Sequence, residues 1–238
     1  MPPFRLSEPT VATFVVIPVL LAIALVCATI DAWRRSGAPE SSARGAGAMT
    51  GGVTAAWMAL TWLAAASGML QKWDSTPPPF ALLILGTLVV SVALSFGAAG
   101  TRLAQQTPIW ALVAVQSFRL PLEIAMHALV ARGIMPVQMS YSGRNLDIVT
   151  GITAVIVAAV VKAGSGGRWL VAAWNVLGLA LLINVVSVAI ASTPRFRYFG
   201  DANVVTFVTY APFVWLPAVM VAAALAGHLV IFRALRRL

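Results

Sequence analysis

The feature that most constrains the fold is a succession of apolar segments, each near the length that crosses a lipid bilayer. About 20 helical residues span the roughly 30 Å hydrocarbon core of a membrane. The chain has about seven such segments, separated by stretches rich in glycine, proline or arginine. Their approximate ranges are 10–33, 51–71, 79–101, 108–132, 147–163, 169–191 and 204–232.

Composition agrees with a membrane protein. Of 238 residues, 10% are charged and 60% are hydrophobic, whereas soluble domains carry about 25% charged residues. We therefore predict an all-α, polytopic membrane helix bundle with seven transmembrane helices, forming a single domain over 1–238. The stretch 34–52, rich in Gly, Ser, Ala and Arg, is predicted to be a flexible cytoplasmic loop.

Basic residues predict the direction of the chain, because cytoplasmic loops carry an excess of lysine and arginine. Nine basic residues fall on the side that holds the C-terminus, and six fall on the other. We expect the N-terminus outside and the C-terminus in the cytoplasm. The net charge of +9 is scattered between apolar runs, so the expected partner is the lipid bilayer and not nucleic acid.

One apolar segment carries a stripe of polar and charged side chains. Gln116, Arg119, Glu123 and His127 follow one another at spacings of three, four and four residues. At about 100° per residue, these positions lie on one face of a helix. A charge at the centre of a spanning helix costs roughly 2.5–3.5 kcal/mol on insertion scales. The stripe is therefore expected to face protein or water, with Arg119 and Glu123 paired.

The polar loop that follows supplies further candidate residues. It contains the run Ser-Gly-Arg-Asn-Leu-Asp, in which serine and glycine are typical of a turn, and Asn145 or Asp147 is typical of a helix N-cap. Alternatively, Arg144, Asn145 and Asp147 fold back over the stripe and contribute to a binding site. Asn184 and Tyr210, from the last two segments, are expected in the same outer half of the membrane.

Three interpretations of the stripe remain open. Intramembrane ionisable residues commonly mark ligand, ion or proton sites. Alternatively, Glu123 and His127 act as the acid–base pair of a membrane-embedded enzyme. A third possibility is a buried salt-bridge network that only fixes helix packing, as in a structural or assembly subunit of a membrane complex.

No cofactor and no metal site are expected. A retinal Schiff base needs a lysine inside the bundle, but Lys72 and Lys162 fall at segment ends. His127 and His228 are predicted near opposite membrane faces, which does not suit one haem. The single cysteine, Cys27, lacks the partners of a zinc cluster.

Several of these residues resemble an uncharacterised bacterial family of small, about seven-span membrane proteins. The resemblance rests on Phe118-Arg119, on Glu123, on the Gly-Arg-Asn-Leu-Asp-Ile run that ends at Ile148, and on the segment 212–217. It implies a multi-pass protein of the bacterial inner (cytoplasmic) membrane and favours stripe and loop forming one site. It implies no activity. We therefore predict that the protein binds or transports a small solute or ion through an outward-facing polar pocket, with the enzyme and the structural subunit as alternatives.

Overall fold

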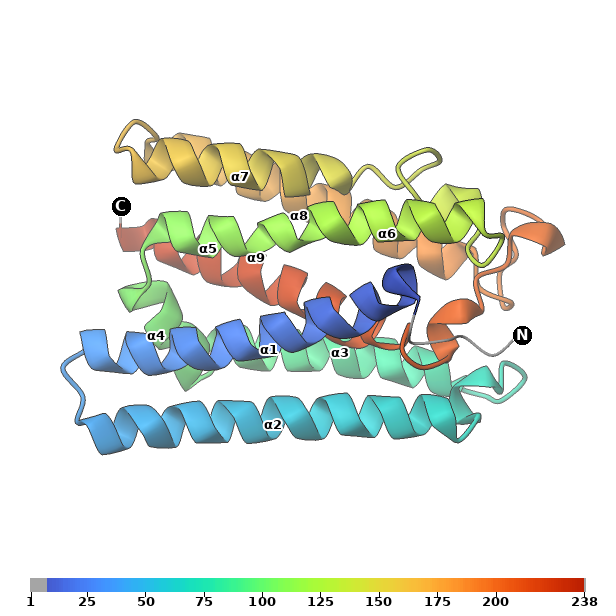
Figure 1. The fold of residues 1–238 in the computed structure, drawn as a ribbon, viewed down its shortest axis with the longest axis horizontal. Coiled ribbons are helices and arrows are strands. Elements are labelled where there is room, and N and C mark those ends of the chain that lie inside the picture. The colour runs from blue at the N-terminus through green and yellow to red at the C-terminus, as the bar shows by residue number, and fades with distance from the viewer. Residues whose placement is uncertain (1–7, 238) are drawn as a thin grey trace.

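The computed structural model describes residues 8–237, and its longer helices run roughly along one common long axis (Figure 1). No strand occurs among those residues. The α-helices of this described part are α1 (Pro9–Arg35), α2 (Glu40–Ala66), α3 (Pro79–Phe96), α4 (Ala98–Gln106), α5 (Ile109–Val115), α6 (Arg119–Ala131), α7 (Ile148–Lys162), α8 (Arg168–Ala191) and α9 (Ala222–Ala234). A 3-10 turn, η2 (Gln116–Phe118), joins α5 to α6, and a π-helical turn, η6 (Leu216–Val221), precedes α9.

Within residues 8–237, six helical segments are long and apolar enough to cross a membrane, so the chain is a multi-pass membrane protein. They comprise α1, α2, α3, the continuous α5–η2–α6 segment, α8, and the η6–α9 segment with its C-terminal turn. The seventh predicted span, α7, has 15 residues. At 1.5 Å per residue it is about 22 Å long, which is shorter than the roughly 30 Å hydrocarbon core.

The stretch 34–52 differs from the predicted loop, because most of it is helical. α1 continues to Arg35 and α2 begins at Glu40. Gly47, one of the small residues of this stretch, packs against α1, since a Cβ added to it would lie 2.5 Å from the Ile30 side chain. Small residues let membrane helices approach closely. The small residues that predicted a flexible linker here therefore allow α1 and α2 to pack together.

The last predicted span also begins later than expected. Over 204–215 the chain forms turns and a 3-10 segment, and helical structure starts at Leu216. Pro212 and Pro217 have no N–H to donate to a helix ladder. Side chains bond carbonyls of this region instead: Trp57 donates from Nε1 to the Ala218 oxygen at 2.8 Å. Backbone that leaves the helical ladder at membrane depth is tolerated where protein satisfies it.

The short helix α7 begins near the middle of the long axis (Figure 1). The connection from α6 runs back along the bundle to Asp147, the N-cap residue of α7. α7 then packs against α5, η2 and α6. This arrangement brings the end of the polar loop to the depth of the polar stripe.

Two apolar clusters flank that depth. α6 contributes Leu122, Met126 and Leu129 to one cluster, whereas α5 contributes Ile109 and Val113 to the other. The polar stripe begins between these two sets along the chain. The centre of the bundle is therefore where the polar groups of α6 must find partners.

Candidate functional site

Arg119, at the start of α6, is the centre of a buried polar network. Its side chain is 1% exposed, and Nη1 donates to Oδ1 of Asp147 at 2.7 Å. Nη1 also lies 3.4 Å from the Gly178 carbonyl oxygen, and Nη2 lies 3.1 Å from Nε2 of His228. The expected pairing of Arg119 with Glu123 is wrong, because the loop carboxylate of Asp147 takes that position.

Glu123 lies one turn further along α6 and bonds the loop instead. Asn145 donates from Nδ2 to Oε1 of Glu123 at 2.7 Å and to the Met139 carbonyl at 3.0 Å. The Asp147 backbone N–H donates to Oδ1 of Asn145 at 3.0 Å. One buried asparagine thus ties α6, the loop and the start of α7 together. The side chains of Asn145 and Asp147 both fold back onto the stripe.

Two residues outside the predicted candidate set complete the network. Nδ1 of His228, on α9, lies 2.8 Å from Oδ1 of Asn175, on α8. Asn175 also donates from Nδ2 to the His228 carbonyl at 3.1 Å. Both side chains are fully buried. In the sequence His228 precedes Arg233 of the basic tail by five residues, a position that predicts a membrane edge. His228 is nevertheless buried, because it lies on the face of α9 that packs against α8.

Two glycines make room for these contacts. A Cβ added to Gly151 of α7 would lie 2.5 Å from the Leu120 backbone nitrogen. A Cβ added to Gly178 of α8 would lie 2.6 Å from Cε1 of His228 and 2.9 Å from Cγ2 of Thr150. Only glycine lets α7 approach the start of α6, and lets the imidazole lie against α8, this closely.

Three other candidates lie away from Arg119. His127 is half-buried, with Nδ1 3.3 Å from Oγ of Ser142 and its ring stacked on Tyr141 at a centroid distance of 4.5 Å. Arg144 is exposed and lies over the Phe199 ring, while its carbonyl accepts a hydrogen bond from Nδ2 of Asn184 at 2.8 Å. His127 of α6 and Asn184 of α8 thus contact the loop, and Arg144 belongs to it.

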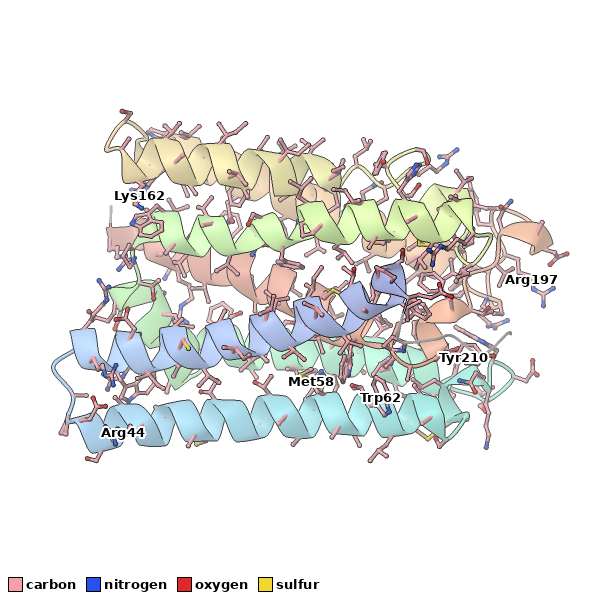
Figure 2. The ribbon with its side chains drawn as sticks, in the orientation of Figure 1. Arg44, Met58, Trp62, Lys162, Arg197 and Tyr210 are labelled. Carbon is pink, nitrogen blue, oxygen red and sulfur yellow. The ribbon has the colours of Figure 1, made fainter. Side chains whose placement is uncertain are left out.

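The remaining two candidates are also separate from the network. Tyr210 is half-buried toward the same end of the bundle as Arg197 (Figure 2), and no hydrogen bond joins its hydroxyl to the network within the described residues. Gln116 is buried and lines an apolar cavity. No hydrogen bond joins Glu123 to His127 among residues 8–237, so the predicted acid–base pair is not assembled in this conformation.

The network carries one negative charge in excess when its acids and its arginine are ionised. Arg119 faces two carboxylates, and His228 adds no charge in its neutral form. Oε2 of Glu123 and Nε of Arg119 are buried without a hydrogen-bond partner within the described structure. Buried charges are costly unless they are compensated. The Glu123 side of the network can therefore accept one more positive charge or one more hydrogen bond.

The network is closed. Its four central residues, Arg119, Glu123, Asn145 and Asp147, are at most 5% exposed. They line neither of two cavities, of about 170 and 60 Å³, that lie among the described residues. Among the described residues, no three His, Cys, Asp or Glu side chains are placed to hold a metal ion. A ligand of the network must therefore be very small, or the loop must move to admit it.

Comparison with known proteins identifies a family. Residues 77–236 match the family described as Domain of unknown function (DUF8737). The match covers more than half of the chain, so the chain belongs to this family. No curated protein and no solved structure matches it. The finding is consistent with the resemblance to an uncharacterised family, and the matched range contains the whole network from Arg119 to His228.

Proposed function

We propose that this member of the DUF8737 family is a bacterial cytoplasmic-membrane protein that binds and transports a small ion, with Glu123 as the binding group. The ion that the site supports best is a proton or a monovalent cation. The observation that carries the proposal is the buried, unbonded Oε2 of Glu123 in a network with one negative charge in excess. A single positive charge at that oxygen balances the network.

The backbone around the site supports the same proposal. Non-helical backbone at membrane depth occurs where protein or a cavity satisfies it, and many transporters bind their ions at such interrupted helices near the midplane. Here α7 starts near the middle of the bundle, directly after Asn145 and Asp147. A helix that starts at this depth has no structural advantage over a longer span, which favours a role in binding.

We propose that this conformation is the occluded state, in which the buried network is shut off from water on both sides of the membrane. Access to Glu123 requires the loop 132–147 to move away from α6. His127 of α6 stacks on Tyr141 of that loop and lies within hydrogen-bond distance of Ser142. Asn184 of α8 donates to the loop carbonyl of Arg144. With the proposed direction of the chain, this loop opens to the outside.

The direction proposed for the chain is N-terminus outside and C-terminus in the cytoplasm. At one end of the bundle, two basic residues of the predicted cytoplasmic set lie over tryptophan rings: Arg102 over Trp33, and Lys162 over Trp110. Arg44 and Lys162 lie at that end, and Arg197 lies toward the other (Figure 2). An end enriched in lysine and arginine favours the cytoplasmic side.

Ion flux in reconstituted liposomes tests the proposal. The purified chain is incorporated into liposomes that contain a pH-sensitive dye or, in a parallel preparation, a sodium-sensitive dye. An inside-negative potassium diffusion potential is imposed, with and without an external sodium gradient. We expect proton or sodium entry above that of empty liposomes. Glu123→Gln removes the charge and is expected to abolish the flux, whereas Glu40→Gln, the same change at an exposed position, is expected to leave it unchanged. Absence of flux in the wild-type chain under both gradients contradicts transport.

A structural subunit is the second candidate, and one observation favours it. The network bonds α6, the loop, α8 and α9 to one another without lining either cavity. In that case Glu123→Gln leaves every flux unchanged, and the protein is recovered with partner chains when it is extracted in mild detergent. The enzyme alternative has less support, because Glu123 and His127 bond different partners.

A further inference from the structure

The larger cavity, of about 170 Å³, lies where the helices α1 and α2 meet α3, α5 and α9. Its lining is almost wholly apolar and contains no charged side chain. Apolar cavities of about 150 Å³ hold molecules the size of benzene. The cavity therefore has room for part of a hydrocarbon chain or a ring.

The cavity lies at the depth of the membrane interior. Val53, which lines it, is the middle residue of the 27-residue helix α2, about 20 Å from either end at 1.5 Å per residue. Trp57, one turn further along, also lines it. The cavity is partly open, and its exposed lining residues Ala24, Val53 and Val115 are all apolar and lie within candidate spans. Its occupant therefore enters from the hydrocarbon of the bilayer.

One polar group distinguishes this cavity from a simple packing defect. Gln116 lines it and is fully buried, and its Oε1 has no hydrogen-bond partner within the described structure. Its Nε2 lies 3.4 Å from the Ala224 carbonyl oxygen. Gly227 leaves the space that this amide occupies, since a Cβ there would lie 2.0 Å from Nε2. The free oxygen is an acceptor that an apolar occupant cannot satisfy.

We propose that this cavity binds a neutral membrane lipid that bears a free hydroxyl next to its hydrocarbon, with the hydroxyl donating to Oε1 of Gln116. A phosphate head group is a poor occupant, because the lining offers no positive charge at this depth. The site is independent of the ion site, since no hydrogen bond joins Gln116 to Arg119 or Glu123 among the described residues. Gln116 therefore takes part in lipid binding, and ion binding at Glu123 does not require it.

Binding of matched probes tests this proposal. The probes are a long-chain alcohol brominated within a few carbons of its hydroxyl and the methyl ether of the same compound, which lacks the donor hydrogen. Both are titrated into the full chain in detergent, and quenching of Trp57, a lining residue, is obtained as the difference between the wild-type chain and Trp57→Phe. One added hydrogen bond of typical strength predicts that the alcohol binds about fivefold more tightly than the ether.

Four variants separate the site from general lipid contact. Gln116→Leu, or Gln116→Met if the first variant folds poorly, is expected to make alcohol and ether bind equally. Ala22→Leu places a larger side chain in the lining and is expected to weaken both probes, whereas Ala55→Leu, on the exposed face of the same helix pair, should leave them unchanged. Equal binding of alcohol and ether to the wild-type chain overturns the proposal. So does a preference for the alcohol that persists in both Gln116 variants, or an Ala22→Leu effect no larger than that of Ala55→Leu.

Discussion

At the scale of single residues, the two carboxylates of the network are not equivalent. Asp147 has a cation as its partner, Nη1 of Arg119 at 2.7 Å. Glu123 has only the neutral amide of Asn145 at 2.7 Å, and its second oxygen is unbonded. The same kind of substitution is therefore expected to have opposite consequences at these two positions.

The buried ion pair is expected to be costly to break and less costly to delete. Arg119→Gln leaves two buried carboxylates without a cation, and Asp147→Asn leaves the guanidinium without its hydrogen-bonded carboxylate. Breaking a buried ion pair by removing one partner costs about 3–5 kcal/mol. The double change removes both charges, so its loss should be smaller than the sum of the single losses. The free energy of unfolding in detergent, followed by circular dichroism, measures this. The control pair is Arg197 and Asp201, which is exposed and 2.8 Å apart, so the same changes there should have little effect. Equal losses at the two pairs contradict the expectation.

Glu123→Gln is expected to leave stability unchanged or to raise it. The glutamine oxygen can still accept the hydrogen bond from Asn145, and the excess negative charge is removed. Glu123→Ala deletes the acceptor and should cost about 1–3 kcal/mol, the typical penalty for leaving a buried polar partner unsatisfied. Unfolding titrations of both variants check the order. If Glu123→Gln destabilises the chain as much as Asp147→Asn does, the negative charge of Glu123 is compensated in the native protein.

At the scale of secondary-structure elements, the network depends on how closely α7 and α8 approach their neighbours. Gly151 lies against the backbone at the start of α6, whereas Gly178 lies against His228. A methyl group at Gly151 meets backbone atoms, which cannot rotate away as a flexible side chain can. The position of α7, and with it that of Asp147, is therefore sensitive to one methyl group.

Gly151→Ala is expected to destabilise the protein by about 1–3 kcal/mol, the typical cost of overpacking. Gly52→Ala is the matched control, because a Cβ there meets nothing within 4 Å and alanine favours a helix by about 1 kcal/mol. Thermal unfolding of both variants in the same detergent gives the comparison. A Gly151→Ala protein as stable as Gly52→Ala shows that α7 can shift outward at no cost.

The sequence predicts the helical class and the position of the polar stripe, because long apolar runs and the cost of buried charge act locally. As an alternative to a turn and a helix cap, it also suggests that Arg144, Asn145 and Asp147 fold back onto the stripe. The structure places the side chains of Asn145 and Asp147 there, but that of Arg144 over the Phe199 ring; a role in binding stays a prediction. The partner of Arg119 could not be predicted, because helical spacing permits Glu123 equally well. His228 and Asn175 meet only through the packing of α8 against α9, which no local pattern shows.

At the scale of the whole molecule, the chain crosses the bundle in alternating directions (Figure 1). α1 carries its basic residues Arg34 and Arg35 in its last turn, at the same end as the basic turn that follows α9. If α7 also crosses the membrane, the two chain termini lie on opposite sides. The family match begins at residue 77, so α1 and α2 precede the matched part, although α1 packs against α4, α6 and η6.

Reporter fusions are expected to place the C-terminus in the cytoplasm. A fluorescent protein that folds only in the cytoplasm should be active when it is fused after the last residue. An alkaline phosphatase, which is active only outside the cytoplasm, should be active when it is inserted between Arg197 and Asp201. The reverse pattern of activities inverts the proposed direction and turns the loop 132–147 toward the cytoplasm.

The shortness of α7 has a consequence for the lipids beside it. Its outer face carries exposed apolar residues, among them Ile152, Val155 and Ile156, but only about 22 Å of it can match hydrocarbon. Neighbouring lipid must thin or tilt along this flank, at a cost of fractions of a kcal/mol per ångström of mismatch. Shorter-chain lipids should therefore be enriched beside α7 and not around the rest of the protein. In a thicker bilayer, the hydrophobic mismatch is largest where α7 begins. The position of the residues around Asp147 should thus depend on the thickness of the surrounding membrane.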